Sequence, residues 1–378
     1  MLQPTGLAVL ERLGLAGKAA RRGSRIDGLF GLNERGEPAL DSPYSGLSAE
    51  AFGIGIHRAS LFDILFDAVT AAGIAIKTGH EIVGTTFTPH ARRLEFADET
   101  SSAPFDLVVD ATGWRTPLAG PTGGVLDFGA LWATLPLEPG DPFAGNLLEQ
   151  RYRRASQMVG VLPIGQGQAA FFWSLRGDAH QEWRNKGLAC WKDEVRALWP
   201  ETDCMLGRIE SADQLTFARY AHRQTRSAME PRLMRIGDSW HSASPQLGQG
   251  ANMALLDAWG LAQGLEQGRT LDEGLRLAQG WRGDHVWLYQ LVTRFFTPLF
   301  QSDEAVWPML RDRAMMPLSR IWPFSRIQAQ MMSGMFGFPL QQLGLGEPDY
   351  GALASASSIA PRTSGSAQST SPTTRQTS

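Results

Sequence analysis

Residues 237–257 read GDSWHSASPQLGQGANMALLD and follow a short apolar run, LMRI. The run predicts a strand, and ligands of open α/β sheets bind beyond the carboxyl ends of strands. Gly237 allows a ligand to approach the backbone closely, and Asp238 supplies two oxygen acceptors that suit a polyol hydroxyl. Gly248 and Gly250 then open a predicted helix whose first N–H groups can stabilise negative charge. The stretch therefore predicts an α/β fold with a ligand site at this strand end.

Eight positions of the stretch match the pattern G-D-x-x-H-x-x-x-P-x-x-G-x-G-x-N-x-x-x-x-D: Gly237, Asp238, His241, Pro245, Gly248, Gly250, Asn252 and Asp257. It resembles the second flavin-binding motif of the para-hydroxybenzoate hydroxylase family of FAD-dependent monooxygenases. In that family the Asp contacts the ribityl chain, and the Gly-rich helix start lies against the pyrimidine end of the isoalloxazine. The resemblance implies a set of FAD-binding residues: Gly237, Asp238, Pro245, Gly248, Gln249, Gly250, Ala251 and Asn252.

A structural interpretation of the same stretch stays open beside this one. The glycines would then serve only a tight strand–turn–helix connection, and Asp238 would cap the turn or the helix. His241 is placed by the resemblance, and a structural hydrogen bond is the role we expect for it.

Two further segments resemble elements of the same family. The sequence from Arg58 through Leu61 to Leu65 is similar to the family's R-x-x-L-x-x-x-L element, whose Arg lies near the cofactor. FDLVVDATGWRTPL has the placement of the family's D-G motif, with Gly113 retained and Thr112 in place of the acidic residue. The resemblance implies that Arg58 and Gly113 lie near the flavin, whereas without it they are a solvated helix residue and a turn glycine.

The family's opening G-x-G-x-x-G turn, which holds the FAD pyrophosphate, does not occur in this sequence. The first residues, MLQPTGLAVLERLGL, resemble the helix that normally follows that element. We therefore expect an N-terminally truncated Rossmann-like domain, either because the recorded start lies downstream of the real one or because the gene is shortened. FAD binding by the chain as written would then be weakened or lost.

Composition narrows the class of protein further. The chain has 378 residues, of which 43% are hydrophobic and 19% charged, so about two folded domains are expected. A net charge of −3 makes nucleic acid an improbable partner. Cys190 and Cys204 form neither a disulfide framework nor a zinc pattern, so we expect a cytoplasmic protein without a metal. No signal peptide or transmembrane segment is expected.

The predicted fold class is α/β, with a Rossmann-like FAD-binding domain, an inserted mixed β-sheet substrate domain and C-terminal helices. The FAD-binding domain is assigned to residues 1–123 and 236–270, with helices over 4–15, 59–72 and 251–263, and strands that include 74–77. The substrate domain is assigned to residues 124–235, with one helix over 178–198. Residues 271–350 are expected to be helical, and residues 351–378 to be a disordered tail.

Aromatic and apolar clusters carry less specific signals. The helix over 178–198 carries an apolar stripe that predicts a core or subunit face: Trp183, Leu188, Trp191, Val195 and Leu198. One or two of Phe171, Phe172 and Trp173 are candidates for an aromatic pocket. The Met- and Trp-rich C-terminal region, with interspersed arginines, is interpreted as packed helices. An oligomer interface or peripheral membrane contact is the alternative, and the oligomeric state is left open.

The function expected from the resemblance is an FAD-dependent monooxygenase that uses NADH or NADPH and O₂ to hydroxylate an aromatic or other electron-rich, hydrophobic small molecule. Two alternatives remain at this point: a related flavoprotein reductase or epoxidase acting on an isoprenoid-like substrate, and a flavin-free remnant that acts as a binding protein. The sequence identifies no catalytic residue.

Overall fold

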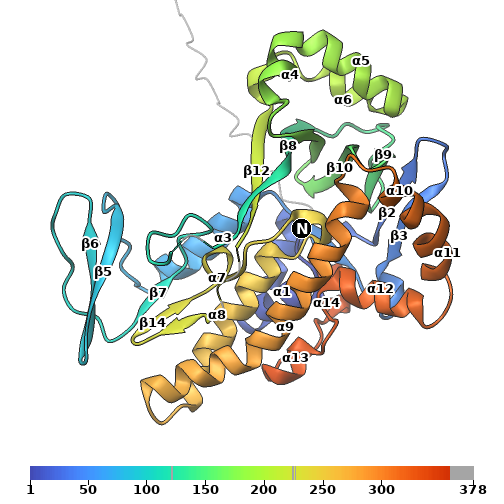
Figure 1. Cartoon of the computed structure of the whole chain (residues 1–378). Helices are drawn as coiled ribbons and strands as arrows, with labels where there is room; N and C mark the ends of the chain where they lie inside the picture. Colours follow the sequence, from blue (N-terminus) through green and yellow to red (C-terminus); the bar gives the residue numbers. More distant parts are fainter. Residues whose placement is uncertain (121, 224, 226, 358–378) are drawn as a thin grey trace, which may run out of the picture.

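The computed structural model describes residues 1–120, 122–223, 225 and 227–357. Helices and strands are interleaved up to Arg235, and the regular elements described after it are all helices (Figure 1). The helices are α1 (Pro4–Arg12), α2 (Ala16–Arg22), α3 (Arg58–Ala71), α4 (His180–Lys186), α5 (Leu188–Leu198), α6 (Asp203–Gly207), α7 (Asp238–His241), α8 (Gly250–Gln267), α9 (Leu271–Phe300), α10 (Val306–Leu310), α11 (Met316–Ser319), α12 (Phe324–Ser333), α13 (Pro339–Gln342) and α14 (Tyr350–Ser357). The strands are β1 (Ser24–Ile26), β2 (Gly28–Asn33), β3 (Pro38–Pro43), β4 (Gly53–Gly55), β5 (Ile82–Thr88), β6 (Ala91–Phe96), β7 (Val108–Asp110), β8 (Gly124–Pro136), β9 (Leu147–Arg153), β10 (Gln157–Gly165), β11 (Gln168–Arg176), β12 (Thr216–His222), β13 (Met229–Glu230) and β14 (Leu233–Arg235). The predicted α/β class is confirmed.

The largest sheet has seven strands in the order β12-β8-β11-β10-β9-β2-β3. Strands β2 and β9 run parallel and all other neighbours antiparallel, so the sheet is mixed, as predicted. Two of its strands, β2 and β3, come from residues 28–43 and extend the sheet beyond the segment 124–235. The early part of the chain therefore contributes directly to the sheet of the predicted substrate domain.

Helices α4, α5 and α6 cover one face of this sheet (Figure 1). The single helix predicted over 178–198 is wrong, because Gly187 adopts a φ of +83° and separates α4 from α5. The predicted role of the stripe is confirmed, since Trp183, Trp191 and Val195 are buried in the apolar core between these helices and the sheet.

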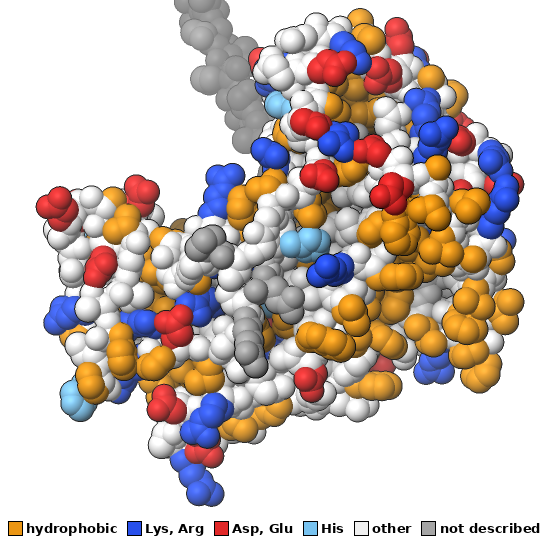
Figure 2. All heavy atoms as spheres, in the orientation of Figure 1, with side chains coloured by type: hydrophobic (Ala, Val, Ile, Leu, Met, Phe, Trp, Pro, Cys, Tyr) orange, Lys and Arg blue, Asp and Glu red, His pale blue; other side chains and the backbone are white. Residues whose placement is uncertain are grey.

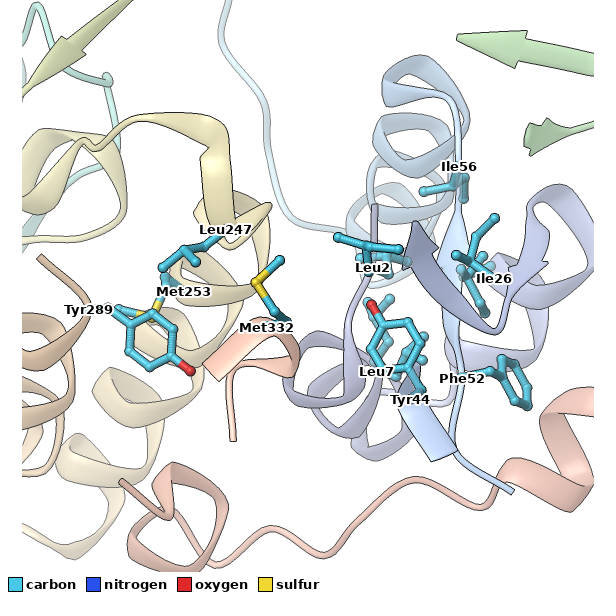
Figure 3. Close-up of a cluster of buried hydrophobic side chains, with 14 of the residues drawn as sticks. Leu2, Leu7, Ile26, Tyr44, Phe52, Ile56, Leu247, Met253, Tyr289 and Met332 are labelled. Atoms are coloured by element: carbon cyan, nitrogen blue, oxygen red, sulfur yellow. The ribbon is translucent and has the colours of Figure 1, made fainter. Parts of the chain in front are cut away.

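A second, larger core lies around α1, α8 and α9 (Figure 3). Helices α8 and α9 touch through glycines, because a Cβ on Gly264 would lie 2.5 Å from the carbonyl oxygen of Gly274. Beside them, β14 pairs with β13 and, in parallel, with β7. This parallel pair brings the segment after Asp110 next to the segment after Arg235.

Three expectations about single elements have definite outcomes. The helices predicted over 4–15, 59–72 and 251–263 are confirmed as α1, α3 and α8. The strand predicted over 74–77 is wrong, since these residues form no regular structure. Helix α14 occupies the first residues of the predicted tail, and residues 358–378 lie outside the described part of the chain.

Candidate functional site

Gly237 and Asp238 lie directly beyond the carboxyl end of β14. Gly237 has φ +58° and ψ −139°, a conformation that a residue with a side chain rarely adopts, and its N–H donates to Asp257 Oδ2 at 2.9 Å. The Asp238 side chain is exposed, yet enough protein surrounds it that burial raises the pKa of its carboxyl, against lowering by His241 and Arg58. This solvent-accessible carboxylate is available to a ligand.

The start of α8 is open. Gly248 adopts a left-handed φ of +62° and turns the chain into the helix, and no side chain caps the helix at Gln249. Gly250 is exposed, and a Cβ placed on it would meet no described atom within 4 Å. The free N–H groups and the positive end of the helix dipole of this 18-residue helix therefore face open space.

Two predicted cofactor residues direct their side chains into the protein instead. Gln249 is buried and donates to the carbonyl oxygen of Met332 at 2.8 Å. Asn252 is buried, accepts from the N–H of Gln3 at 2.9 Å and donates to the carbonyl oxygen of Gly248 at 3.1 Å. Their side chains hold the turn and the segment before α1 in place, so any contact with a ligand is left to their backbone.

A series of buried, hydrogen-bonded polar side chains, here called the polar chain, holds the turn at Gly237 in place. The Asp257 carboxylate accepts from Arg282 Nε at 2.8 Å and contacts His241 Nε2 at 2.6 Å, which is the structural hydrogen bond expected for His241. Burial by itself would raise the pKa of Asp257, but His241, Arg282 and the Gly237 N–H lower it to about 2. This carboxylate is therefore ionised and fixes the Gly237 backbone.

His285 extends this chain toward the C-terminal helices. Its Nδ1 lies 2.8 Å from Arg282 Nη1, and its Nε2 lies 3.1 Å from the carbonyl oxygen of Gly334. Burial, followed by the charge of Arg282, lowers the pKa of His285 to about 3, so the ring is neutral. A neutral ring that accepts from Arg282 donates through Nε2 to Gly334. The polar chain thus links the Gly237 turn to the turn after α12.

Arg58 is the first residue of α3 and is exposed. Its charge lowers the pKa of three groups, the Asp238 carboxyl, the Tyr220 hydroxyl and the Met1 amino terminus. It forms no ion pair within the described ranges. The charge of Arg58 therefore acts on Asp238 from a distant part of the sequence.

Gly113 lies in the loop that follows β7 and has a φ of +88°. The loop is held by Asp110, whose carboxylate accepts from the Thr112 N–H at 3.0 Å and from the Thr116 hydroxyl at 2.6 Å. The Asp110 carbonyl oxygen accepts from the Ser239 hydroxyl at 2.6 Å, which attaches this loop to α7. The loop and the Asp238 segment are thus direct neighbours.

Successive side chains of β11 point to opposite faces of the sheet, so the three aromatic residues Phe171, Phe172 and Trp173 lie in two different cores. Phe171 and Trp173 belong to the core under α4 to α6, whereas Phe172 belongs to the core on the other face of the sheet. There Phe172 stacks on Trp132 with ring centroids 4.7 Å apart, and Trp132 Nε1 donates to the Tyr220 hydroxyl at 3.1 Å. These residues form an aromatic surface on the face of the sheet that is turned toward α7 and α8.

A cationic cleft lies beside the Gly113 loop. Its volume is about 500 Å³, and it is open to solvent. Trp114 and Arg115 line it from the loop, and Arg184 and Arg219 line it from α4 and β12. Of the three arginines, only Arg184 has an ion-pair partner among the described residues, Asp213 at 3.5 Å. The cleft therefore presents positive charge next to an aromatic ring.

Several of these functional features were not identified from the sequence: Arg282, His285, Trp132, Tyr220, Arg115 and Arg219. The burial of Arg282 could have been predicted from the sequence, because Arg282 falls on the buried stripe of α9 that includes Ala278 and Val286. An arginine at an apolar position of an amphipathic helix indicates a buried charge with a partner. Tyr220 and Trp132 carried no comparable signal, since their contact depends on strand pairing.

Comparison with known proteins identifies the class. A family model described as FAD binding domain matches residues 1–272, and the chain belongs to this family. Two curated relatives are 26% identical to it. Aurachin C monooxygenase/isomerase of Stigmatella aurantiaca aligns over 306 residues, 74% of each chain. 3-Amino-4-hydroxybenzoate 2-monooxygenase of Streptomyces cremeus aligns over 272 residues, 68% of this chain and 66% of its own.

Solved structures share the fold. 2-Methyl-3-hydroxypyridine-5-carboxylic acid oxygenase superposes with a TM-score of 0.72 at 18% identity, over 90% of this chain and 86% of its own. HpxO of Klebsiella pneumoniae, complexed with FAD and uric acid, gives 0.72 at 18% identity, over 89% and 88%. The resemblance stated from the sequence is confirmed: the protein is a flavin-dependent monooxygenase of the aromatic-hydroxylase type. The reductase or epoxidase and the flavin-free alternatives are not favoured.

The geometry around Asp238 fits FAD. An exposed carboxylate suits the hydroxyls of a ribityl chain, and the open start of α8 suits the electron-rich end of a flavin ring. Gly250 adds no bulk at this point, because a Cβ on it would meet no atom within 4 Å apart from its chain neighbours and its own helix backbone.

Proposed function

We propose that this protein binds FAD between Asp238 and the start of α8, and hydroxylates a small aromatic compound with O₂ and NADH or NADPH. The observation that carries the proposal is the meeting of the exposed Asp238, the uncapped start of α8 and the charge of Arg58 at the end of β14. Bound FAD supplies the redox and oxygen chemistry, which amino-acid side chains cannot perform.

The residues around the flavin have separate tasks in this proposal. Asp238 would accept hydrogen bonds from the ribityl hydroxyls. The N–H groups at Gly250 and Ala251, which α8 already aligns, would stabilise negative charge at the pyrimidine end of the ring. Arg58 would add a positive charge that acts on Asp238. Asp257 contributes indirectly, because it fixes the Gly237 backbone on which Asp238 stands.

The aromatic surface of Trp132, Phe172 and Tyr220 is proposed to hold the substrate ring. Burial raises the pKa of Tyr220 to about 12, against lowering by the hydrogen bond from Trp132 and by the charge of Arg58, so its hydroxyl keeps its proton. That hydroxyl accepts from Trp132, and no described residue accepts its proton. Tyr220 can therefore donate to an oxygen atom of the substrate. An electron-rich ring with an oxygen substituent fits this arrangement, and one of the curated relatives that match the chain has a name that specifies a hydroxybenzoate.

The cationic cleft is proposed to receive the nicotinamide cofactor. Arg115 and Arg219 have no ion-pair partner within the described part of the chain, and they suit the phosphates of NADH or NADPH. Trp114 offers a ring on which adenine can stack. We also propose a cytoplasmic location, because Cys190 and Cys204 are free thiols and Cys190 is exposed.

Flavin titration tests the FAD site directly. Purified chain is titrated with FAD, and binding is followed by the quenching of flavin fluorescence. We expect Asp238→Ala to weaken FAD binding about tenfold, the effect of losing a charge-assisted hydrogen bond. Asp213→Ala, in the cationic cleft, is the matched control and leaves the titration unchanged. An Asp238→Ala titration that coincides with the wild-type curve contradicts the site.

Substrate-stimulated oxidation of the nicotinamide cofactor tests the reaction. In the presence of FAD, hydroxybenzoates and other phenolic compounds are screened for faster loss of NADH or NADPH absorbance, together with a hydroxylated product. Arg219→Gln is expected to raise the KM for the nicotinamide cofactor about tenfold, with little change in kcat. Oxidation that no aromatic compound accelerates would argue for a different substrate class.

A further inference from the structure

The C-terminal helices expose a continuous group of large apolar side chains, here called the C-terminal apolar face. In Figure 2 hydrophobic side chains gather where α9 to α12 lie in Figure 1, with few charged side chains among them. The members of the face are Trp287, Leu291, Phe295, Val306, Met309, Leu310, Leu318, Ile321, Trp322 and Phe324. Trp322 is 77% exposed, Ile321 59% and Trp287 58%, so burial within the chain does not explain them.

The exposed row on α9 is not required for packing of the helix. Trp287, Leu291 and Phe295 follow one another at intervals of four residues, which places them on one side of α9. The opposite side of the helix is already buried through residues such as Val286 and Tyr289. Helix α9 is therefore apolar on two sides, and only one of them is covered by described residues.

Positive charge exceeds negative charge around the face, although the exposed Asp284 and Glu304 lie three and two residues before Trp287 and Val306. Between Glu304 and Glu347 the sequence contains four arginines and a single acidic residue, Asp312. That acidic residue pairs with the buried Arg311. Exposed arginines border the face, and three of them form no ion pair within the described part of the chain: Arg294, Arg313 and Arg326.

We infer that the C-terminal apolar face rests on the surface of an anionic lipid bilayer. Tryptophan and phenylalanine side chains with flanking arginines are the composition that binds at the boundary between lipid headgroups and acyl chains. The unpaired arginines attract anionic headgroups. Within the described residues, no helix is long and apolar enough to cross a bilayer. The inferred contact is therefore with the bilayer surface.

A second copy of the chain fits the face less well. A two-fold interface would bring the same patch of both copies together, and with it their arginines. The unpaired arginines outnumber the exposed acidic side chains beside the face, Asp284 and Glu304, so a second copy would neutralise only part of their charge, whereas an anionic membrane neutralises all of it.

Vesicle flotation tests the inference with a readout that does not depend on flavin or turnover. Full-length protein is mixed with vesicles of phosphatidylcholine alone, or of phosphatidylcholine with phosphatidylglycerol. We expect it to float with the anionic vesicles, and about 0.5 M salt to reduce the bound fraction, since screening weakens the arginine contribution. The double variant Ile321→Glu/Trp322→Glu is expected to bind at least tenfold more weakly. Phe105→Glu, at a similarly apolar residue that is 44% exposed but lies outside the face, retains wild-type binding.

A second variant separates charge from apolar contact. Arg313→Gln/Arg326→Gln should weaken binding to the anionic vesicles about fivefold for each arginine removed. Circular dichroism establishes that each variant is folded. The inference is overturned if the wild type fails to float with anionic vesicles, or if the Ile321→Glu/Trp322→Glu variant floats as the wild type does. It is equally overturned if sedimentation velocity shows a dimer that this variant dissociates while vesicle binding is absent.

Discussion

The two cores of this molecule differ in the polarity of their side chains. Under α4 to α6 the core is apolar and aromatic, with Trp191 meeting the rings of Phe171, Trp173 and Trp183 edge-on at centroid distances of 6.1 to 6.5 Å. Under the Gly237 turn the interior contains an ionised Asp257. The first arrangement stabilises a sheet whatever the pH. The second arrangement costs solvation free energy, because it buries charged groups. It fixes backbone groups at defined positions, as a cofactor site requires.

Removal of Trp191 should have the largest effect. Its side chain is 1% exposed, and Trp191→Ala would leave a cavity that three aromatic rings line, with an expected loss of about 4 kcal/mol in the free energy of unfolding. Urea denaturation followed by circular dichroism measures it. Trp191→Phe is the control and should lose less than half as much, because it keeps an aromatic ring and removes an indole N–H that has no described partner. Equal losses would show that ring packing is not what stabilises this core.

Arg282 tests the polar interior by the same measurement. Arg282→Met keeps a long side chain but leaves the Asp257 carboxylate without its cationic partner, at a cost of about 3 kcal/mol. The double variant Asp257→Asn/Arg282→Met removes both charges and should recover part of that loss. In both variants the FAD titration should weaken, because Gly237 loses a fixed acceptor or its orientation. Additive losses in the double variant would mean that the two charges do not interact.

The contrast between the interiors also explains what the sequence could predict. Gly237 and Gly248 are recognisable because their positive φ angles exclude most other residues, and the tryptophan stripe is recognisable by its helical spacing. The break at Gly187 was not predicted, because one glycine in an amphipathic pattern is compatible with a continuous helix. The addition of β2 and β3 to the sheet, and the contact of Trp132 with Tyr220, depend on pairing between distant segments, which local patterns do not specify.

Lowering the pH should reduce the free energy of unfolding through the polar interior, whereas none of the described buried side chains of the apolar core titrates. His285 has a folded-state pKa of about 3 against an ordinary value of 6.5, so below pH 6.5 the unfolded chain takes up a proton that the folded chain excludes. The contribution is fully present above pH 6.5 and is lost as the pH falls toward 3, by about 1.4 kcal/mol per pH unit. Urea titrations between pH 7 and 4.5 measure the slope. His285→Gln, which cannot take up that proton, should show a smaller slope, and an unchanged slope would contradict the role given to His285.

Tyr220→Phe should have the smallest effect on stability and a selective effect on binding. The hydroxyl accepts only from Trp132 among described residues, so its loss should change the free energy of unfolding by about 1 kcal/mol. Tyr220 also lies where the pairing of β12 with β8 is irregular, between Arg219 opposite Gly129 and Ala221 opposite Val125. Such irregularities redirect a side chain, and here the Tyr220 hydroxyl meets Trp132 Nε1.

The KM for the aromatic substrate separates this role from a purely structural one. If the Tyr220 hydroxyl donates to the substrate, Tyr220→Phe raises that KM about tenfold and leaves the KM for NADH or NADPH unchanged. Phe217→Leu, on the same strand and beside the cationic cleft, is the matched control and should spare the aromatic substrate. A variant that loses stability without any change in either KM would make Tyr220 a support for Trp132. The substrate's oxygen would then have to be bound from the α7 and α8 side, where Arg58 is the cation that acts on both Asp238 and Tyr220.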